Sequence, residues 1–373
     1  MYIKEIELYN FRNYEELHLE FHKNVNLILG NNAQGKTNLL ESIYLCSMGK
    51  SFRTGRDSDL IRFGSEFARV KAEAKKEYYD TSVELIYSRN GGKSARLDGN
   101  RIRKASELLE NLYMVIFSPE DLKIVKEEPE KRRRFIDREL CQLKPRYYEA
   151  FSNYKKVLLQ RNAYLKEESV DPSILDLWDM QLARYGAQIM VMRKEFVEKL
   201  RDISQVIHQS ITNGKETLNL KYVPNVSVSA TAEETEEAYY QVMRGSFEND
   251  FRQRTTTRGP HKDDVEFFID AISVRSFGSQ GQQRTSALSV KLAELSLIKE
   301  ETGEDAILLL DDVMSELDLQ RQEFLIKSLS DIQMFITTTE IPEKLMETLP
   351  PGKTFYVKEG NVTEKEKENE PSI

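Results

Sequence analysis

A phosphate-binding loop is indicated by the residues Gly30-Asn31-Asn32-Ala33-Gln34-Gly35-Lys36-Thr37. They follow the apolar run from Val25 to Leu29 and precede a helical pattern, which is the context that such a loop needs. The glycines let backbone N–H groups point at one anion, and the positive end of the following helix adds to that field. Lys36 would contact the β- and γ-phosphates, and Thr37 would offer its hydroxyl to Mg²⁺. The sequence therefore predicts a nucleoside triphosphate site, and the alternative is a chance glycine turn before a helix.

A second part of this site is predicted where an apolar strand, Ile307 to Leu310, ends in Asp311 and Asp312. In phosphate-loop proteins a carboxylate at this point holds Mg²⁺ directly or through water. We expect Asp311 to fill that role, and Asp312 to act as the general base that orients the attacking water. With Lys36, these carboxylates form the predicted catalytic set. An apolar strand ending in Asp-Asp is also a common structural pattern, so this prediction depends on the phosphate loop.

Length and composition limit the number of domains and the class of protein. The chain has 373 residues, which favours two domains, and 39% hydrophobic with 31% charged residues is typical of a soluble globular protein. No apolar run approaches the roughly 18–20 residues of a membrane helix, and no signal-peptide pattern is present, so we expect a cytoplasmic protein without membrane contact. Cys46 and Cys141 are too few and too far apart to suggest a disulfide framework or a zinc site.

Hydrophobic patterning predicts how the elements are divided. Residues 15–21 alternate as a half-buried strand, and the Asp98-Gly99 dipeptide signals a hairpin, so an antiparallel portion should lie beside the nucleotide-binding sheet. The pattern is helical from about 121 to 210, with Ser118 as the predicted helix cap. A heptad-like stripe from Leu175 to Phe196 predicts a long helix that packs on residues 147–166. Strands are expected at 265–269, 307–310 and 334–337.

A resemblance to the ABC ATPases begins at Gly278-Ser279-Gln280-Gly281-Gln282, which precedes a helix and resembles the signature motif of that class. Gly278 and Gln280 replace the first Leu and first Gly of the usual motif. The alternative for this segment is an ordinary N-capped helix. Ser315-Glu316-Leu317-Asp318 resembles the D-loop of the class. Where most members carry a switch histidine, this sequence has Thr337-Thr338-Thr339-Glu340, so Thr338 or Thr339 would have to replace it.

The spacing of these motifs distinguishes the ABC subclasses. Between Thr37 and Gly278 lie roughly 240 residues, largely helical, which resembles the SMC-like branch rather than transporter ATPases. Within that branch the chain resembles the RecF family of bacterial replication and repair proteins over nearly its full length. The motifs that carry this resemblance are Phe11-Arg12-Asn13-Tyr14, Gly30 to Thr37, Leu40-Glu41, Lys50-Ser51-Phe52-Arg53, Phe117 to Asp121, Arg258-Gly259-Pro260-His261-Lys262-Asp263-Asp264, Gln280 to Arg284 and Leu310-Asp311-Asp312.

The resemblance implies an α/β fold, with an ABC-type ATPase head and a large helical arm. We expect the head in residues 1–120 and 256–357, the arm in 121–255, and a disordered tail in 358–373, where Lys and Glu alternate. The head would combine a mixed sheet, part of it antiparallel, with the phosphate-loop core.

For mechanism, the resemblance implies that two copies pair around ATP and Mg²⁺. Ser279, Gly281 and Gln282 would contact ATP held by the phosphate loop of the other copy, and Arg12 and Asn13 would contact the nucleotide as well. The ATP-bound homodimer would clamp single- or double-stranded DNA at gaps or junctions, and a weak, DNA-stimulated ATPase would release it. The family acts with RecR and RecO to load recombinase, which implies a place in recombinational repair and the SOS response.

A DNA surface on this chain must be local, because the net charge is −8 and the sequence pI about 5.4. The candidate contacts fall in three basic segments: Arg101, Arg103 and Lys104; Arg132 and Arg133; Arg252 and Arg254. Each segment is equally consistent with a solvated face, and the second can pair with nearby glutamates. The segment from His261 to Asp264 fits a loop-ordering role.

Two other function classes remain open from the sequence. A transporter-coupled ABC ATPase would share the nucleotide motifs, but it conflicts with the long helical insert and the missing switch histidine. A small-molecule kinase would share the phosphate loop, but it leaves the segment around Ser279 without a role.

Overall fold

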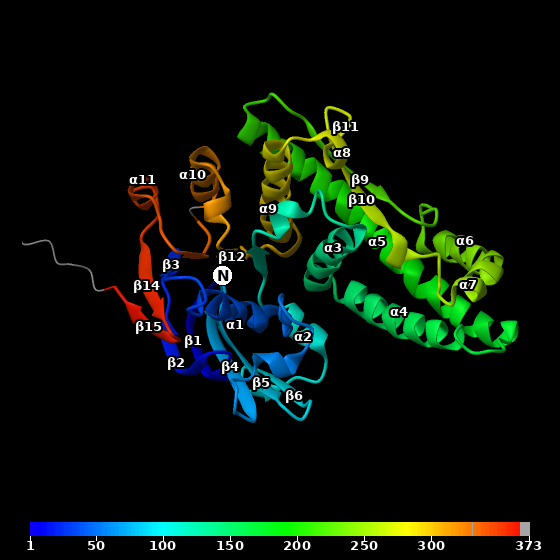
Figure 1. The fold of residues 1–373 in the computed structure, drawn as a ribbon, viewed down its shortest axis with the longest axis horizontal. Helices are drawn as coiled ribbons and strands as arrows, with labels where there is room; N and C mark the ends of the chain where they lie inside the picture. Colours follow the sequence, from blue (N-terminus) through cyan, green and yellow to red (C-terminus); the bar gives the residue numbers. More distant parts are fainter. Residues whose placement is uncertain (330, 366–373) are drawn as a thin grey trace, which may run out of the picture. The chain divides into compact units, whose positions relative to one another are not determined.

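The computed structural model describes residues 1–329 and 331–365 (Figure 1). They form two compact units. The first unit comprises Met1–Asp121 and the chain from Ile298 onward, and the second comprises Leu122–Leu297. The expected boundary at 120 lies next to the observed one. The expected boundary at 255 does not, because the second unit continues to Leu297.

A six-stranded sheet forms the nucleotide-binding half of the first unit, with strand order β15-β14-β3-β13-β12-β8. All neighbouring pairs are parallel except β14–β15. Strands that are covered on both faces read as continuous apolar runs, which is why Ile307 to Leu310 stood out in the sequence. The strands are β3 (Val25–Leu29), β8 (Met114–Phe117), β12 (Ile307–Asp311), β13 (Met334–Thr338), β14 (Gly352–Lys358) and β15 (Asn361–Glu364).

An antiparallel sheet, β2-β1-β4-β5-β6-β7, forms the other half of the first unit. Its strands alternate buried and exposed positions, as a sheet with one covered face requires. Helix α1 (Lys36–Met48) contacts strands of both sheets, and its residues Leu39 and Ile43 belong to one core with strand residues of each. The strands are β1 (Tyr2–Phe11), β2 (Tyr14–Glu20), β4 (Phe67–Lys75), β5 (Asp80–Ser88), β6 (Lys93–Leu97) and β7 (Asn100–Arg101).

Short helices complete the first unit: η1 (Asp57–Leu60), α2 (Ala105–Leu109), η4 (Met314–Glu316), α10 (Leu319–Ser328) and α11 (Glu343–Met346). Helix η2 (Asp121–Lys123) lies at the boundary between the two units. An α/β head that combines a mixed sheet with an antiparallel portion was predicted, and the sheet topology confirms it.

The second unit is built on helix α5 (Pro172–Thr212), whose 41 residues extend roughly 60 Å at about 1.5 Å per residue. Asp171 caps its start by accepting a hydrogen bond from Ser173 N, and Asn213 ends it in the left-handed conformation. Helix α4 (Pro145–Tyr164) packs along α5, as the heptad-like stripe predicted, and Trp178 lies against Tyr164. The other elements are α3 (Pro129–Leu143), β9 (Leu218–Val223), α6 (Ala232–Gly245), α7 (Phe247–Gln253), η3 (Pro260–Lys262), β10 (Asp264–Ile269), β11 (Ile272–Ser273), α8 (Val274–Phe277) and most of α9 (Gln280–Thr302).

Several boundaries differ from the sequence prediction. Ser118 does not cap a long helix; its backbone N and its Oγ both donate to Asp121, which starts only the short helix η2. The helical stretch predicted from 121 to 210 breaks at Lys144 and again before Asp171. Disorder was expected from residue 358 onward, but β15 pairs with β14 inside that range. Residues 366–373 of the expected tail lie outside the described residues.

No helix among the described residues is long and apolar enough to cross a membrane.

Candidate nucleotide site

The phosphate-binding loop (residues 30–37, the P-loop) connects β3 to α1 in a conformation that its glycines permit. Gly30 has φ 154° and Gly35 has φ 122°, both in the range that residues with a side chain rarely adopt. A Cβ at Gly35 would lie 2.6 Å from Asn13 Nδ2. No side chain caps the N-terminus of α1, so its first N–H groups and its positive dipole end are available to an anion.

The side chain of Lys36 forms hydrogen bonds with the backbone of the P-loop itself. Its Nζ donates to the carbonyl oxygens of Gly30 and Asn31. Burial lowers the pKa of Lys36, and the carboxylates of Asp312 and Asp311 oppose this shift. Carbonyl oxygens are weaker partners for an ammonium group than phosphate oxygens are, so the lysine is placed to exchange them for a phosphate.

A hydroxyl–carboxylate pair lies where a magnesium ion would bind. Thr37 Oγ1, at the start of α1, donates to Asp311 Oδ1, at the end of β12, over 2.9 Å. Thr337 Oγ1 donates to the same oxygen, also over 2.9 Å. Burial raises the pKa of Asp311, and the two hydroxyls oppose the shift. Threonine hydroxyl and aspartate oxygens are ligands that Mg²⁺ prefers, so these residues fit the ion.

Asp312 differs from its neighbour. Its backbone has φ 54°, and its N–H donates to the backbone oxygen and to Oγ1 of Thr337. Its carboxylate accepts no hydrogen bond from any residue that the structure describes. A partly exposed carboxylate with free acceptor capacity is suited to orient a water molecule.

The turn between β1 and β2 supports the P-loop from the side. Asn13 Nδ2 donates to Gln34 O over 3.0 Å, and Tyr14 Oη donates to Gly35 O over the same distance. Arg12, which was also predicted to contact nucleotide, instead holds the buried Glu41 through two hydrogen bonds of 2.8 and 2.7 Å. Its remaining Nη1 donates to Asp59 O. The structure therefore brings Asn13 to the loop and places Arg12 in the support of α1.

Sequence reasoning missed several residues around this site. Thr337, not Thr338 or Thr339, is the threonine that contacts Asp311; Thr338 Oγ1 donates to Glu340 O instead. A chain of side-chain hydrogen bonds runs from Arg53 through Asn38 to Asn13. The Lys50 to Arg53 motif entered the sequence analysis only through the family resemblance, and only the fold shows that Arg53 contacts Asn38.

The signature-like segment opens α9 in the second unit. Ser279 Oγ accepts from Gln282 N over 3.2 Å, and Gln282 Oε1 accepts from Ser279 N over 2.9 Å. This reciprocal arrangement is a capping box. In the single chain, the segment therefore forms the ordinary N-capped helix that was the alternative to a signature motif. Gln282 Nε2 also donates to Glu216. Ser279 nevertheless remains exposed, and so does Phe277 beside it.

The residues predicted to contact DNA differ in how exposed their side chains are. Arg101, Arg103 and Lys104 are exposed on the hairpin side of the first unit, and Arg252 and Arg254 are exposed in the second unit. Arg254 Nη1 also donates to the carbonyl oxygens of Leu165 and Glu167.

Arg132 must be corrected as a candidate DNA contact. It is 2% exposed, and its Nε and Nη2 hold Asp264 at 2.6 and 2.9 Å. Its position in the basic run on α3 falls on the inward face of that helix, where a phosphate cannot reach it. Arg133 is partly buried and donates to Asp263 O.

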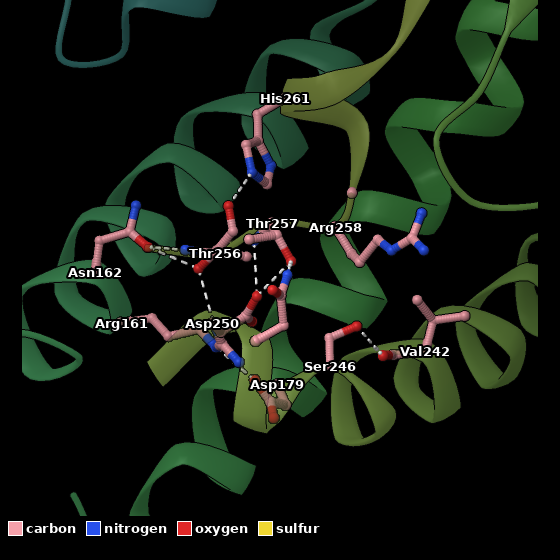
Figure 2. A network of polar contacts seen from close by, with 12 residues as sticks. Arg161, Asn162, Asp179, Val242, Ser246, Asp250, Thr256, Thr257, Arg258 and His261 are labelled. Atoms are coloured by element: carbon pink, nitrogen blue, oxygen red, sulfur yellow. Dashed lines mark hydrogen bonds and ion pairs between the residues drawn. The ribbon is translucent and has the colours of Figure 1, made fainter. Parts of the chain in front are cut away.

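The segment from Arg254 to Asp264 orders the second unit. Arg161 donates to Asp179 and Asp250 over 2.6 and 2.8 Å and to Thr256 over 2.8 Å; we refer to these four residues as the Arg161 network (Figure 2). His261 lies beside it, bonded to Tyr154 and to Thr256 O. Asp263 accepts from Arg193, Tyr222 and Asn225 N. This arrangement agrees with the loop-ordering interpretation.

Comparison with known proteins gives a consistent result. The family described as RecF/RecN/SMC N terminal domain matches residues 2–358. The chain is 44% identical over 366 residues to the "DNA replication and repair protein RecF" of Clostridioides difficile (strain 630), covering 97% of this chain and 98% of that protein. It is 45% identical over 365 residues to the protein of the same name in Alkaliphilus oremlandii, covering 97% and 100%.

Solved structures agree. A structure described as the recombination mediator protein RecF-ATPrS in the RecFOR pathway has a TM-score of 0.91 and 38% identity, with 97% of this chain and 98% of that chain covered. The same mediator described with ATP has a TM-score of 0.90, at 38% identity and with 98% of each chain covered. An Smc head bound to part of ScpA is 17% identical with a TM-score of 0.55 over 99% of this chain and 98% of that chain, and it shares the fold alone.

Proposed function

The chain belongs to the RecF family, and on that premise we propose that it is an ATP-switched DNA-binding protein of recombinational repair and replication. The observation that carries this proposal is the geometry of the P-loop site. The P-loop offers an uncapped helix end, a lysine on exchangeable partners and a Thr37–Asp311 pair suited to Mg²⁺. The two solved relatives are described as the recombination mediator protein RecF, one with ATPrS and one with ATP.

ATP is the proposed ligand and Mg²⁺ its companion ion. Lys36 and the N–H groups of residues 30–37 would hold the phosphates, and Thr37 and Asp311 would hold the ion. Magnesium would neutralise charge on the β- and γ-phosphates and add positive charge beside the Asp311 carboxylate. Asp312 would orient a water molecule. Hydrolysis at this site is proposed to be slow, as in the family that the chain belongs to, so that it serves as a switch rather than as metabolic turnover.

A second copy of the chain is the proposed partner at this site. Ser279, Gly281 and Gln282 of one protomer would contact the γ-phosphate held by the other. Ser279 is exposed at a helix N-terminus, where anions are stabilised. ATP then contributes contacts that only a dimer can use, so it shifts the monomer–dimer equilibrium by that difference in affinity.

DNA binding is proposed for the exposed basic segments, which in a dimer are present twice. Arg101, Arg103 and Lys104 form one segment, and Arg252 and Arg254 form the other. They would contact phosphates without reading bases, so binding should weaken steeply with salt. RecR and RecO are the proposed protein partners in loading recombinase, and the cytoplasm is the proposed site of action.

The test is sedimentation of the full chain with ATP and Mg²⁺, with ADP, and without nucleotide, followed by DNA binding across a salt series. A dimer that forms only with ATP, and binds DNA more tightly in that state, supports the proposal. A chain that stays monomeric at saturating ATP contradicts it. Lys36→Arg is the control, because it keeps the charge but changes the geometry at the phosphates.

A further inference from the structure

An imidazole and two carboxylates converge on one face of the antiparallel sheet, at the end of the β1–β2 hairpin opposite the turn that contacts the P-loop. Glu5 lies on β1, and His18 and Glu20 lie two residues apart on β2, so all three side chains project from the same face. One ligand atom from each lies within 4.8 Å of the others. We propose that Glu5, His18 and Glu20 form a binding site for a divalent transition-metal ion such as Zn²⁺.

Strand register sets up this cluster. Glu5 and Glu20 are direct partners in the β1–β2 pair, and Glu5 is also the register partner of Glu73 on β4. Three glutamates therefore lie in a row across three strands, an arrangement that like-charge repulsion disfavours. Lys71 pairs with Glu73 and with Glu7. Among the residues that the structure describes, no lysine or arginine pairs with the carboxylate of Glu5 or Glu20.

The nearby cations serve other groups. Lys4 pairs with Asp80, and Lys353 pairs with Glu364 while donating to the backbone oxygen of Glu20. A bound cation would relieve the repulsion that remains between Glu5 and Glu20. His18 Nε2, 3.8 Å from Glu5 Oε2, offsets this repulsion only when the imidazole is protonated, whereas a bound metal ion would do so with the imidazole neutral.

The donor set favours transition metals over magnesium or calcium. His18 Nε2 lies 3.8 Å from Glu5 Oε2, near the roughly 3.4 Å edge of a tetrahedron with bonds of about 2.0–2.1 Å. Small rotamer changes would close the site and leave a position for water. Imidazole suits zinc, cobalt and nickel, whereas magnesium demands oxygen ligands in octahedral geometry. Both cysteines are buried and do not compete for the ion.

The proposed site is separate from the nucleotide site and does not depend on the proposed function. Phe11 follows Glu5 by six positions along β1, which corresponds to roughly 20 Å at about 3.4 Å per residue. The same hairpin carries Asn13 and Tyr14, which contact the P-loop. A metal ion at this site would cross-link the open end of that hairpin.

The test is titration of the metal-free full chain, without nucleotide, using Zn²⁺ by calorimetry and Co²⁺ by visible absorption. We expect one ion per chain, with a ligand-field spectrum that Mg²⁺ at equal concentration does not displace. Even residues outside the ligand shell change metal affinity by about 10- to 100-fold, so His18→Ala and Glu20→Gln should each lower it by about tenfold or more.

Two matched variants decide the outcome. Glu16→Gln removes an exposed carboxylate from the same strand without touching the three ligands, and Asp311→Asn removes the carboxylate of the nucleotide site. Both should bind Zn²⁺ like the wild type. The proposal is overturned if His18→Ala also binds like the wild type, if Glu16→Gln weakens binding as strongly, or if Asp311→Asn abolishes it.

Discussion

The P-loop and the Arg161 network are both rich in charged groups, but they satisfy those charges differently. At the P-loop, Lys36 contacts backbone oxygens of its own loop, and the Asp312 carboxylate accepts no hydrogen bond from the described residues. In the Arg161 network the guanidinium meets two carboxylates, and both it and Asp250 are fully buried. Charges that are paired and desolvated fix a fold, whereas charges left with spare capacity are available to a ligand.

The largest effect should come from breaking the buried pairing. Asp250→Ala removes one of the two carboxylates that Arg161 contacts. It also removes the acceptor of two hydrogen bonds that the N–H and hydroxyl of Thr257 donate. The buried Arg161 guanidinium keeps only Asp179, and the N–H and hydroxyl of Thr257 lose their acceptor, so the free energy of unfolding of the second unit should fall by about 3–5 kcal/mol. The single tryptophan, Trp178, lies in this unit against Tyr164, so its fluorescence during urea unfolding reports the change.

The control is Asp202→Ala, which removes a solvent-exposed partner of Arg201 from the same long helix. Its unfolding curve should superimpose on that of the wild type, because exposed ion pairs add little. If Asp250→Ala and Asp202→Ala lowered the free energy of unfolding equally, the buried charge pairs would be no more important to the fold than exposed ones.

Histidine protonation should produce the next effect. Burial lowers the pKa of His261 to about 4 from the ordinary 6.5, so between these values the unfolded chain binds more protons than the folded one. The stability contribution of this residue is complete above pH 6.5 and is lost as the pH falls toward about 4. At about 1.4 kcal/mol per pKa unit, the loss reaches at most about 3.5 kcal/mol.

His261→Asn isolates this term. Its free energy of unfolding, followed by Trp178 fluorescence, should vary less between pH 6.5 and 4 than that of the wild type. Burial raises the pKa of Asp179 and of Asp263, which contributes with the opposite sign, but both carboxyls are present in both proteins. Identical pH profiles would show that His261 does not titrate in this way.

A smaller effect on binding, with no effect on folding, should follow from Lys36→Met. The lysine contacts only exchangeable carbonyl oxygens, so unfolding of the first unit should change little. A hydrogen bond to a charged group is worth about 1.5–3 kcal/mol, which corresponds to about 10- to 150-fold weaker ATP binding. Calorimetry with ATP and Mg²⁺ measures the affinity. A large loss of stability with unchanged affinity would assign Lys36 to the fold.

The smallest effect concerns single basic residues. Arg101→Ala should lower the slope of log affinity for DNA against log salt by about 1, with unchanged unfolding, because the residue is exposed. Arg132→Ala should instead destabilise the second unit, because it leaves Asp264 without its bidentate partner. Filter binding across a salt series, paired with urea unfolding, separates the two. The reverse pattern would return Arg132 to the DNA surface.

The sequence predicted those features whose signal is local. The P-loop, the apolar strand before Asp311 and the stripe on α5 each lie within one continuous segment, where spacing alone identifies them. Contacts between distant segments could not be predicted in this way. Arg132 belongs to a basic run, yet its position on the inner face of α3 and its pairing with Asp264, across 132 residues, follow only from the tertiary fold.

The same limit applies inside the nucleotide site. Three consecutive threonines, Thr337 to Thr339, lie at the end of β13 and just after it, and composition cannot say which one faces Asp311. The parallel register of β12 and β13 sets Asp311 beside Thr337, so Thr337 is the threonine that contacts the carboxylate. Strand β14 was missed because Gly352 and Lys353 dilute its apolar content, although it pairs with β3 beside the P-loop.

The most direct test of the central claim, that the P-loop is half of a site completed by another copy, is a mixing experiment. Lys36→Met impairs the P-loop and leaves Ser279 intact, and Ser279→Arg does the reverse. Each variant alone should remain monomeric with ATP and Mg²⁺. Donor-labelled Lys36→Met mixed with acceptor-labelled Ser279→Arg should give ATP-dependent energy transfer, because one complete site forms between them. Absence of transfer in the mixture, or dimerisation of either variant alone, would contradict the account.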